Sequence, residues 1–145
     1  MIGLLQRVST ARVEIDGKQV AKIGRGLLVL VGVEPQDSTQ QADRLLERLL
    51  GYRVFPDIDG RMNLGLRDIG GGLLLVPQFT LAADTQKGTR PGFSTAASPE
   101  MGERLFDYLC RQAASRHTPV GFGQFGADMQ VSLTNDGPVT FWLQV

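Results

Sequence analysis

The sequence has few of the residues from which common catalytic and metal sites are built. Its 145 residues include one cysteine, Cys110, and one histidine, His117. A single cysteine excludes an internal disulfide, and without a Cys/His cluster a zinc site is not expected. Cys110 lies beside Leu109 in an expected helix, which favours a packed thiol. His117 follows the end of that helix, where it suits the helix dipole. We therefore expect no metal and no cofactor.

Net charge and long apolar runs are also lacking. Lysine and arginine together number 15, as do aspartate and glutamate, so the formal net charge is zero. This balance argues against holding a long nucleic acid by bulk electrostatics, although it allows recognition of one end. No segment approaches the roughly 18 apolar residues of a transmembrane helix, so no membrane partner is expected. Without disulfides or a signal peptide, the sequence indicates a reducing, cytoplasmic compartment.

The remaining composition is that of an ordinary globular protein. Hydrophobic residues make up 42% and charged residues 21% of a chain long enough to bury its own core. Neither a repeat nor a linker interrupts it. We therefore expect one domain over residues 1–145.

Strands are predicted in the first 33 residues. Residues 2–8 are predicted as a strand, and apolar residues alternate with charged ones over residues 11–15. Asp16-Gly17 is a tight-turn dipeptide, so residues 20–23 should return as a hairpin. Residues 26–33 are almost continuously apolar, which predicts a strand covered on both faces.

Two helices are predicted from caps and apolar periodicity. Ser38 and Gln41 have capping-box spacing, and leucines at helical spacing follow until Gly51. Ser98-Pro99 opens the second helix with proline at the first helical position. The expected apolar stripe of this second helix consists of Met101, Leu105, Tyr108 and Leu109.

Strands return near residue 73 and at the C-terminus. Residues 73–76 predict a second buried strand. Alternating residues predict two more strands, over 129–133 and 139–145, joined by a turn at 135–138. The predicted fold class is α/β, with a mixed sheet and both helices packed on it.

Two segments contain polar or irregular features that suggest function. Gln78 and Thr80 directly follow the predicted buried strand, and strand ends are favoured places for ligand chemistry in sheets flanked by helices. In the second segment, Pro138 begins a strand although it cannot donate to the ladder. From the residues alone, the simpler interpretations are favoured, with Thr80 as a local hydrogen-bonder and Pro138 as a trans proline that ends a turn.

Both segments resemble motifs of the D-aminoacyl-tRNA deacylases. The similar stretches are Gln78-Phe79-Thr80-Leu81 with Ala82-Ala83-Asp84-Thr85, and Asn135-Asp136-Gly137-Pro138-Val139-Thr140-Phe141. Gln6-Arg7-Val8, Gly51-Tyr52-Arg53-Val54-Phe55, Met62-Asn63-Leu64 and Asp128-Met129-Gln130-Val131 also match, in order along the whole chain. The resemblance implies a three-layer α/β/β fold. It also implies a homodimer that hydrolyses the ester joining a D-amino acid, or glycine, to the 3′ end of tRNA.

The resemblance also implies roles for individual residues. Gln78, Phe79 and Thr80 take the catalytic positions. Gly137 and Pro138, joined by a cis bond, reach into the partner subunit's site and exclude L-amino acids, while Arg7 braces them from behind. A rigid wall of backbone selects by exclusion, which would admit many D side chains and glycine.

Two mechanisms are open for such a site. In one, Thr80 is the nucleophile. In the other, the 2′-hydroxyl of the terminal ribose orients or activates water. We favour the second, because no histidine or acid except Asp84 lies near Thr80 in sequence, and a hydroxyl without a base is a poor nucleophile.

The sequence departs from the family pattern at Pro77, where members usually have serine. The change removes a hydroxyl and a backbone N–H, so the role of that serine as an oxyanion donor does not transfer. The simplest hypothesis is that this position is dispensable or acts indirectly.

Three other functions compete with D-specific deacylation. Some relatives of the fold are reported to associate with DNA, which suggests a nucleic-acid adaptor, although zero net charge weakens that hypothesis. A module that only dimerises is a further alternative. Related deacylases with a trans Gly-Pro bond accept small L-amino acids, and Arg7 favours the cis form over that alternative.

Overall fold

The structure is a computed structural model that describes residues 1–145. Its elements, in chain order, are β1 (Ile2–Ile15), β2 (Lys18–Ile23), β3 (Gly26–Gly32), α1 (Thr39–Gly51), β4 (Phe55–Pro56), β5 (Met62–Leu64), α2 (Leu66–Ile69), β6 (Gly72–Pro77), the 3-10 turn η1 (Phe79–Ala82), α3 (Pro99–Arg116), β7 (Val120–Phe122) and β8 (Gln130–Gln144). The predicted α/β class is confirmed.

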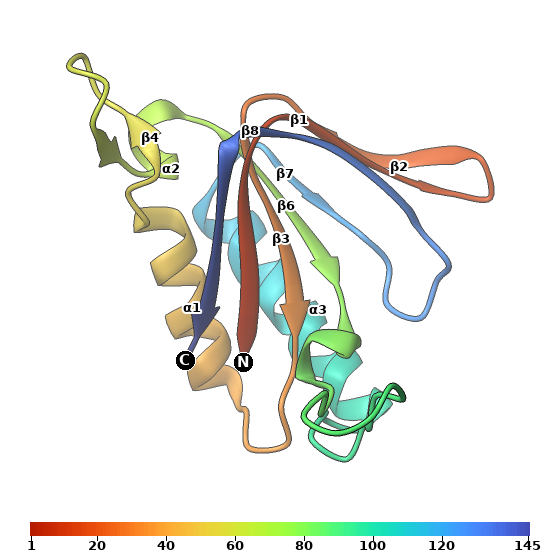
Figure 1. Cartoon of the computed structure of the whole chain (residues 1–145). Coiled ribbons are helices and arrows are strands. Elements are labelled where there is room, and N and C mark those ends of the chain that lie inside the picture. Colours follow the sequence, from red (N-terminus) through yellow and green to blue (C-terminus); the bar gives the residue numbers. More distant parts are fainter.

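One mixed sheet organises the molecule. Its strands lie in the order β2-β1-β3-β6-β7, and β8 pairs with β1 (Figure 1). β1 is antiparallel to β2, β3 and β8, whereas β3, β6 and β7 are parallel to one another. Leu27, Leu28 and Val29 of β3 and Leu73, Leu74 and Leu75 of β6 are fully buried. The two central strands are therefore covered on both faces, as their continuous apolar runs predict.

Other elements cover both faces of the central part of the sheet, so the fold has three layers, as expected. α1 and α3 pack against each other and against one face of the sheet, and their leucines enter the larger core. On the other face, the β1–β2 hairpin curls over β6 and β7 (Figure 1). The approach there is close, because a Cβ at Gly121 would lie 3.2 Å from the Cβ of Ala21. The second core between these strand layers consists of Val8, Ala11, Val13, Ile23, Leu28, Leu74 and Val76.

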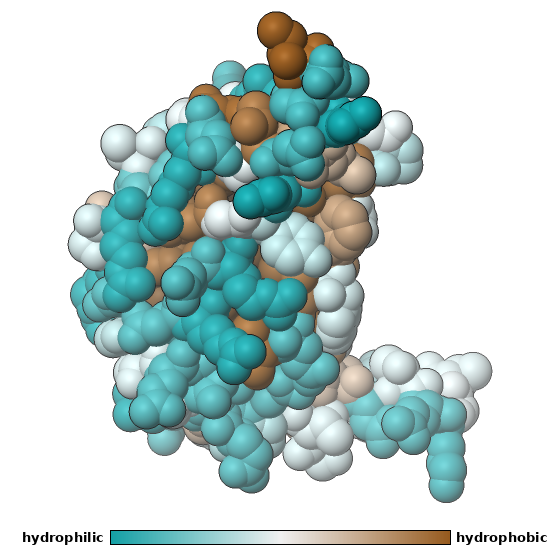
Figure 2. Space-filling view, turned by 90° about the vertical axis from the view of Figure 1, so that its left-hand side faces the viewer, coloured by the Kyte–Doolittle hydropathy of each residue, from teal (hydrophilic) through white to brown (hydrophobic).

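Both long helices begin where their caps predict. Ser38 Oγ accepts from the N–H of Gln40 at 3.2 Å, and the Ser38 N–H donates to Gln41 Oε1 at 2.9 Å. This capping box satisfies donors that the first turn of α1 leaves free. Ser98 Oγ caps α3, in which Pro99 is the first residue. The outer surface seen beside α1 is mainly hydrophilic (Figure 2), so the apolar stripe of this helix faces the core.

The prediction of two C-terminal strands joined by a turn at 135–138 is wrong. β8 is one strand that pairs with β1 along its length. Thr140 lies opposite Gln6 and Asn135 lies opposite Val8, so residues 136–139 bulge out beside Arg7 alone. The physical reason is Pro138, which has no N–H for the ladder, so the strand leaves its partner and rejoins it. The Gly137–Pro138 and Thr118–Pro119 peptide bonds are cis.

Sequence patterning missed the short elements. The connector after α1 contains the β4–β5 hairpin and α2, which project from the edge of the molecule (Figure 1). Ile58 lies at the tip of this hairpin and is fully exposed, which matches the apolar atoms at the top of Figure 2. Two- to four-residue elements carry too little periodicity to be predicted.

Candidate functional site

The first candidate segment lies where the parallel strands end. β6 finishes at Pro77, and the N–H of Gln78 donates to the carbonyl of Val31 at the end of β3, at 2.8 Å. The chain then turns sharply into η1, which presents Phe79 and Thr80 at the surface. The sheet therefore fixes the backbone up to Gln78 and leaves the next two side chains exposed at the strand end.

Thr80 has one side-chain partner. Gln78 Nε2 donates to Thr80 Oγ1 in a short contact, so the amide holds the hydroxyl in place. The carboxylate of Asp84 accepts instead from the N–H of Gln86 at 2.9 Å. His117 contacts the carbonyl of Gly71, at the opposite end of β6, at 2.6 Å. No carboxylate or imidazole of the chain therefore hydrogen-bonds to the Thr80 hydroxyl.

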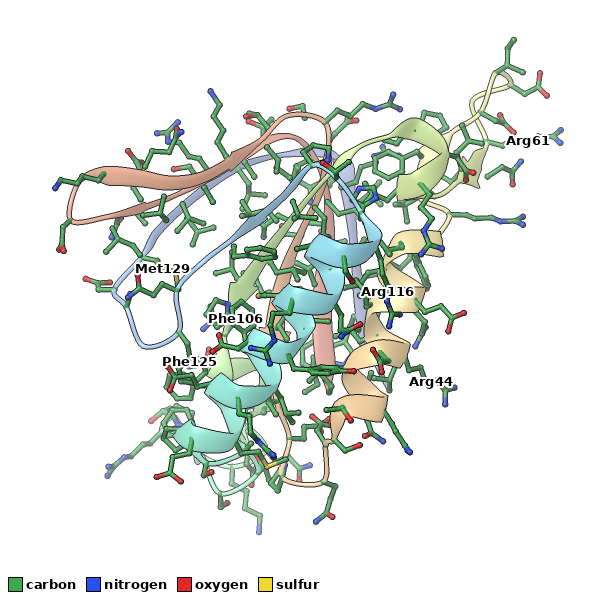
Figure 3. The ribbon with its side chains drawn as sticks, turned by 180° about the vertical axis from the view of Figure 1, so that it is seen from behind. Arg44, Arg61, Phe106, Arg116, Phe125 and Met129 are labelled. Atoms are coloured by element: carbon green, nitrogen blue, oxygen red, sulfur yellow. The ribbon has the colours of Figure 1, made fainter.

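A pocket of about 450 Å³ adjoins Gln78 and Phe79. It opens between the end of β6, the first turns of α3 and the segment between β7 and β8. Phe106 projects from α3, and Phe125 and Met129 lie on that segment (Figure 3). Most of the lining is hydrophobic, with Gln78 and Ser98 as polar exceptions. Such a site suits a flat or apolar group held beside a few polar atoms.

Most of this pocket lining was not predicted from the sequence. Phe106 comes from α3, whereas Phe125 and Met129 lie close together on the later segment between β7 and β8, and no motif spacing links them. Pro77 also lines the pocket, so the position of the family departure borders the candidate site. The signal that could have pointed here was the apolar content of residues 120–129 in a segment without a long element.

The second candidate segment is the bulge of β8, residues 136–139. Arg7 Nε donates to the carbonyl of Asp136 at 2.7 Å, and Nη1 donates to the carbonyl of Val54 at 2.6 Å. A carboxylate oxygen of Asp136 lies 3.6 Å from Nε. Only 12% of the Arg7 side chain is exposed. Arg7 therefore lies behind the bulge and ties it to the chain at Val54.

Asn135 closes the base of the bulge. Its Oδ1 accepts from the N–H of Val139 at 2.7 Å, and its Nδ2 donates to Thr140 Oγ1 at 2.9 Å. These contacts of Asn135 were not predicted from the sequence. Gly137 and Pro138 themselves are exposed at the apex. Gly137 has a φ of 154°, a conformation in which side chains are rarely found, so glycine suits this apex.

The single chain does not bring the two segments together. Arg7 pairs with Leu27 near the start of β3, whereas Pro77 pairs with Val31. Four residues of a strand span about 13 Å. Gly137–Pro138 and Gln78–Thr80 therefore lie toward opposite ends of β3, and both are open to a second molecule.

The structural surroundings of Cys110 and Asp57 explain the shifts in their pKa values. Cys110 packs against the main core, and burial raises the pKa of its thiol to about 12. A neutral thiol is a poor nucleophile. Asp57 Oδ1 and Oδ2 accept hydrogen bonds from backbone and side-chain donors of its own turn. The hydrogen bond from the side chain of Asn63 is the main cause that lowers the pKa of Asp57.

No helix has the length and apolar character needed to cross a membrane.

The chain is similar to known proteins over nearly its whole length. Residues 4–144 match the family model described as D-Tyr-tRNA(Tyr) deacylase. The chain belongs to this family. It is therefore a hydrolase of the deacylase type, and the resemblance drawn from its motifs is confirmed. A D-aminoacyl-tRNA deacylase of Pseudomonas putida is 66% identical over 145 residues, which cover 100% of both sequences.

Two solved structures have folds similar to that of this chain. One is described as c-Myc DNA Unwinding Element Binding Protein, with a TM-score of 0.95 and 35% identity over 100% of this chain and 99% of that chain. The other is described as a probable eukaryotic D-amino acid tRNA deacylase, with a TM-score of 0.83, 18% identity and coverage of 99% and 98%. The second likeness concerns the fold alone.

Proposed function

We propose that this deacylase hydrolyses the ester of D-aminoacyl-tRNA and glycyl-tRNA at the 3′-terminal ribose. The observation that carries the proposal is the bulge of β8, whose exposed Gly137 and Pro138 are tied from behind by Arg7. A wall made of backbone presents the same shape to every substrate. It excludes an L side chain by contact and places no demand on a D side chain or on glycine.

The proposed enzyme acts as a homodimer. The ester and the α-carbon of one aminoacyl group cannot both contact the two candidate segments of one chain, because these segments lie about 13 Å apart along β3. Two copies related by a twofold axis would place the bulge of each beside Gln78 and Thr80 of the other. Both segments are exposed in the single chain, as such an arrangement requires.

Substrate placement follows from the chemistry around Thr80. The terminal adenosine offers an apolar base, and the aminoacyl group offers a side chain. The 450 Å³ pocket beside Gln78 and Phe79 suits the flat base. The ester then lies over η1, and the aminoacyl group points outward to the partner's bulge. Selection and hydrolysis are thus assigned to different subunits.

Hydrolysis needs stabilisation of the developing oxyanion more than a strong base. The first residues of a helical turn have N–H groups without partners inside the turn. Phe79 and Thr80 open η1, so their N–H groups serve as oxyanion donors. Pro77 has no N–H and takes no part. The 2′-hydroxyl of the ribose orients the water, and Gln78 with Thr80 positions the reacting atoms.

The direct test is hydrolysis by the purified protein of D-Tyr-tRNA, Gly-tRNA and L-Tyr-tRNA. We expect the first two to be deacylated and the third to remain intact. Deacylation of L-Ala-tRNA at a comparable rate would instead indicate the relaxed-specificity enzyme. Size-exclusion chromatography with light scattering would measure the dimer, and a monomer at working concentration would contradict action across two subunits.

Nucleic-acid binding without hydrolysis is the second candidate function. It is favoured by the structural neighbour described as a DNA-unwinding-element binding protein, which is 35% identical. The zero net charge of this chain weakens it, because non-specific binding depends on neutralising phosphates. Tight binding of duplex DNA at physiological salt, with no turnover of any aminoacyl-tRNA, would favour it over the proposed deacylase.

A further inference from the structure

The loop that follows η1 places exposed aromatic rings beside cations. Residues 84–95 are exposed throughout. The rings of Phe79 and Phe93 lie 5.1 Å apart between centroids, yet the two residues remain 55% and 46% exposed. Exposed aromatic surface is unfavourable in water, at roughly 25 cal/mol per Å². The two rings are tilted by 50° to each other, and such an open aromatic pair beside a candidate site suggests a binding surface for flat groups.

The loop is anchored to the site. The N–H of Asp84 donates to the carbonyl of Gly92 at 2.8 Å, and the N–H of Gly92 donates back at 2.9 Å. Thr95 Oγ1 also donates to the carbonyl of Ala82, the last residue of η1, at 2.6 Å. The base of the loop is thus fixed within a few residues of Thr80.

Two cations extend from this anchored base. Lys87 is three residues beyond Asp84 and Arg90 is two residues before Gly92, so both backbones lie within about 10 Å of the base. Neither cation has an ion pair, and the carboxylate of Asp84, the only acid in the loop, accepts from a backbone N–H. Residues 84–95 therefore carry two positive charges against one negative charge, a local charge of +1 in a chain whose formal net charge is zero.

We infer that Lys87, Arg90 and Phe93, together with the ring of Phe79, bind the unpaired nucleotides that precede the terminal adenosine of the tRNA. This inference rests on the proposed function. Proteins hold single strands by stacking bases on aromatic rings and by placing cations along the phosphates. The pocket takes the terminal base, and this loop, which starts just after η1, takes the strand that leads to it. A neutral protein thereby binds one end of a nucleic acid through a local charge.

The experiment compares a long and a short substrate. D-tyrosyl-tRNA carries the unpaired strand, whereas the D-tyrosyl ester of adenosine lacks every phosphate and every preceding base. The variants are the double substitution Lys87→Gln/Arg90→Gln and the single substitution Phe93→Leu. Lys18→Gln/Arg44→Gln is the matched control, because both residues are exposed, unpaired and on other elements (Figure 3 labels Arg44).

The quantity compared is the ratio of kcat/KM for D-tyrosyl-tRNA to kcat/KM for the adenosine ester. For Lys87→Gln/Arg90→Gln we expect this ratio to fall by about tenfold or more, because KM for the tRNA rises. The dependence of log(1/KM) on log[salt] should become shallower by about 1.4, for two phosphates at roughly 0.7 each. Phe93→Leu should lower the same ratio by about fivefold or more, because a stacked base contributes roughly 1–3 kcal/mol. The control variant should change neither quantity.

The outcomes separate this inference from the proposed function. An unchanged ratio and an unchanged salt dependence in all loop variants would overturn the strand-binding surface and leave the deacylase intact. Equal losses on both substrates would also overturn it, because they would mean that the loop acts on the reacting end. Absence of turnover of either substrate by the unaltered protein would contradict the proposed function, and the inference with it.

Discussion

The bulge of β8 and the end of β6 are held in different ways. At the bulge, Arg7 and Asn135 hydrogen-bond to its backbone at both flanks. At the strand end, the sheet fixes the chain only to Gln78, and Thr80 relies on one amide. The first region is shaped by backbone and the second presents free side chains. In the proposed enzyme, selection is thus assigned to the region held by backbone hydrogen bonds, and hydrolysis to the region with exposed side chains.

The energetics of Arg7 reinforce this contrast. A guanidinium that is only 12% exposed would be costly without partners, and its hydrogen bonds go to two carbonyls that are far apart in sequence. Thr80, in contrast, is exposed and could lose its partner to water at little cost. The difference between the two regions can be tested by changing the substrate and by replacing one residue at a time.

Replacing the terminal adenosine of D-Tyr-tRNA by its 2′-deoxy form should reduce the deacylation rate by about 100-fold or more. General acid–base assistance contributes roughly 10²–10⁴-fold, and the strand end supplies no base of its own. Single-turnover rates with saturating protein measure the chemical step. An unchanged rate would mean that a group of the protein activates the water. It would contradict the proposal that the 2′-hydroxyl of the substrate does so.

Arg7→Ala should lower the ratio of kcat/KM for D-Tyr-tRNA over L-Tyr-tRNA by about 30- to 100-fold. Hydrogen bonds to a charged group contribute about 1.5–3 kcal/mol, and each 1.36 kcal/mol is tenfold in rate. The control is Arg12→Ala, on the same strand, because Arg12 is 50% exposed and pairs only with Glu14 at 3.0 Å. If Arg7→Ala lowers thermal stability but preserves the D/L ratio, the brace is structural and does not act on selection.

Local patterns predicted the parts of the fold that local forces determine. The cap of α1 at Ser38 and Gln41, and the continuous burial of Leu73 to Val76, follow from hydrogen bonding and periodicity within a few residues. The bulge was missed because Asp136-Gly137 has the local signature of a hairpin. Its true partner is β1, more than a hundred residues earlier, and pairing over that distance leaves no local signal.

The candidate site was predictable to a similar extent. The motif resemblance placed Gln78, Phe79 and Thr80 at the end of a buried strand, where the structure has them. Their separation from Gly137 and Pro138 within one chain could not be predicted, because it depends on the register in which β3 pairs with β1 and β6. The contact between the rings of Phe93 and Phe79 also depends on how an irregular loop returns to η1, which no periodicity encodes.

Thr80→Ala should reduce kcat/KM for D-Tyr-tRNA by about tenfold at most. In the proposed mechanism the hydroxyl positions atoms through one hydrogen bond, which contributes about 1 kcal/mol. Thr80→Ser keeps the hydroxyl and is the matched control. A fall to the uncatalysed rate in Thr80→Ala, with activity kept in Thr80→Ser, would make Thr80 the nucleophile and remove the contrast between the two regions.

Pro77→Ser should change kcat/KM by less than about threefold, the smallest effect of the four. Pro77 has no N–H to offer an oxyanion, so the proposed mechanism assigns that role to the N–H groups that follow it in η1. Its ring lines the pocket, and Pro77→Ala therefore serves as a control that removes the ring without adding a hydroxyl. A gain of about tenfold, or 1.4 kcal/mol, in Pro77→Ser but not in Pro77→Ala would show that a hydroxyl here stabilises the transition state. The end of β6 would then be a catalytic site that Pro77 weakens. The end of β6 and the bulge of β8 would differ less than their hydrogen bonds indicate.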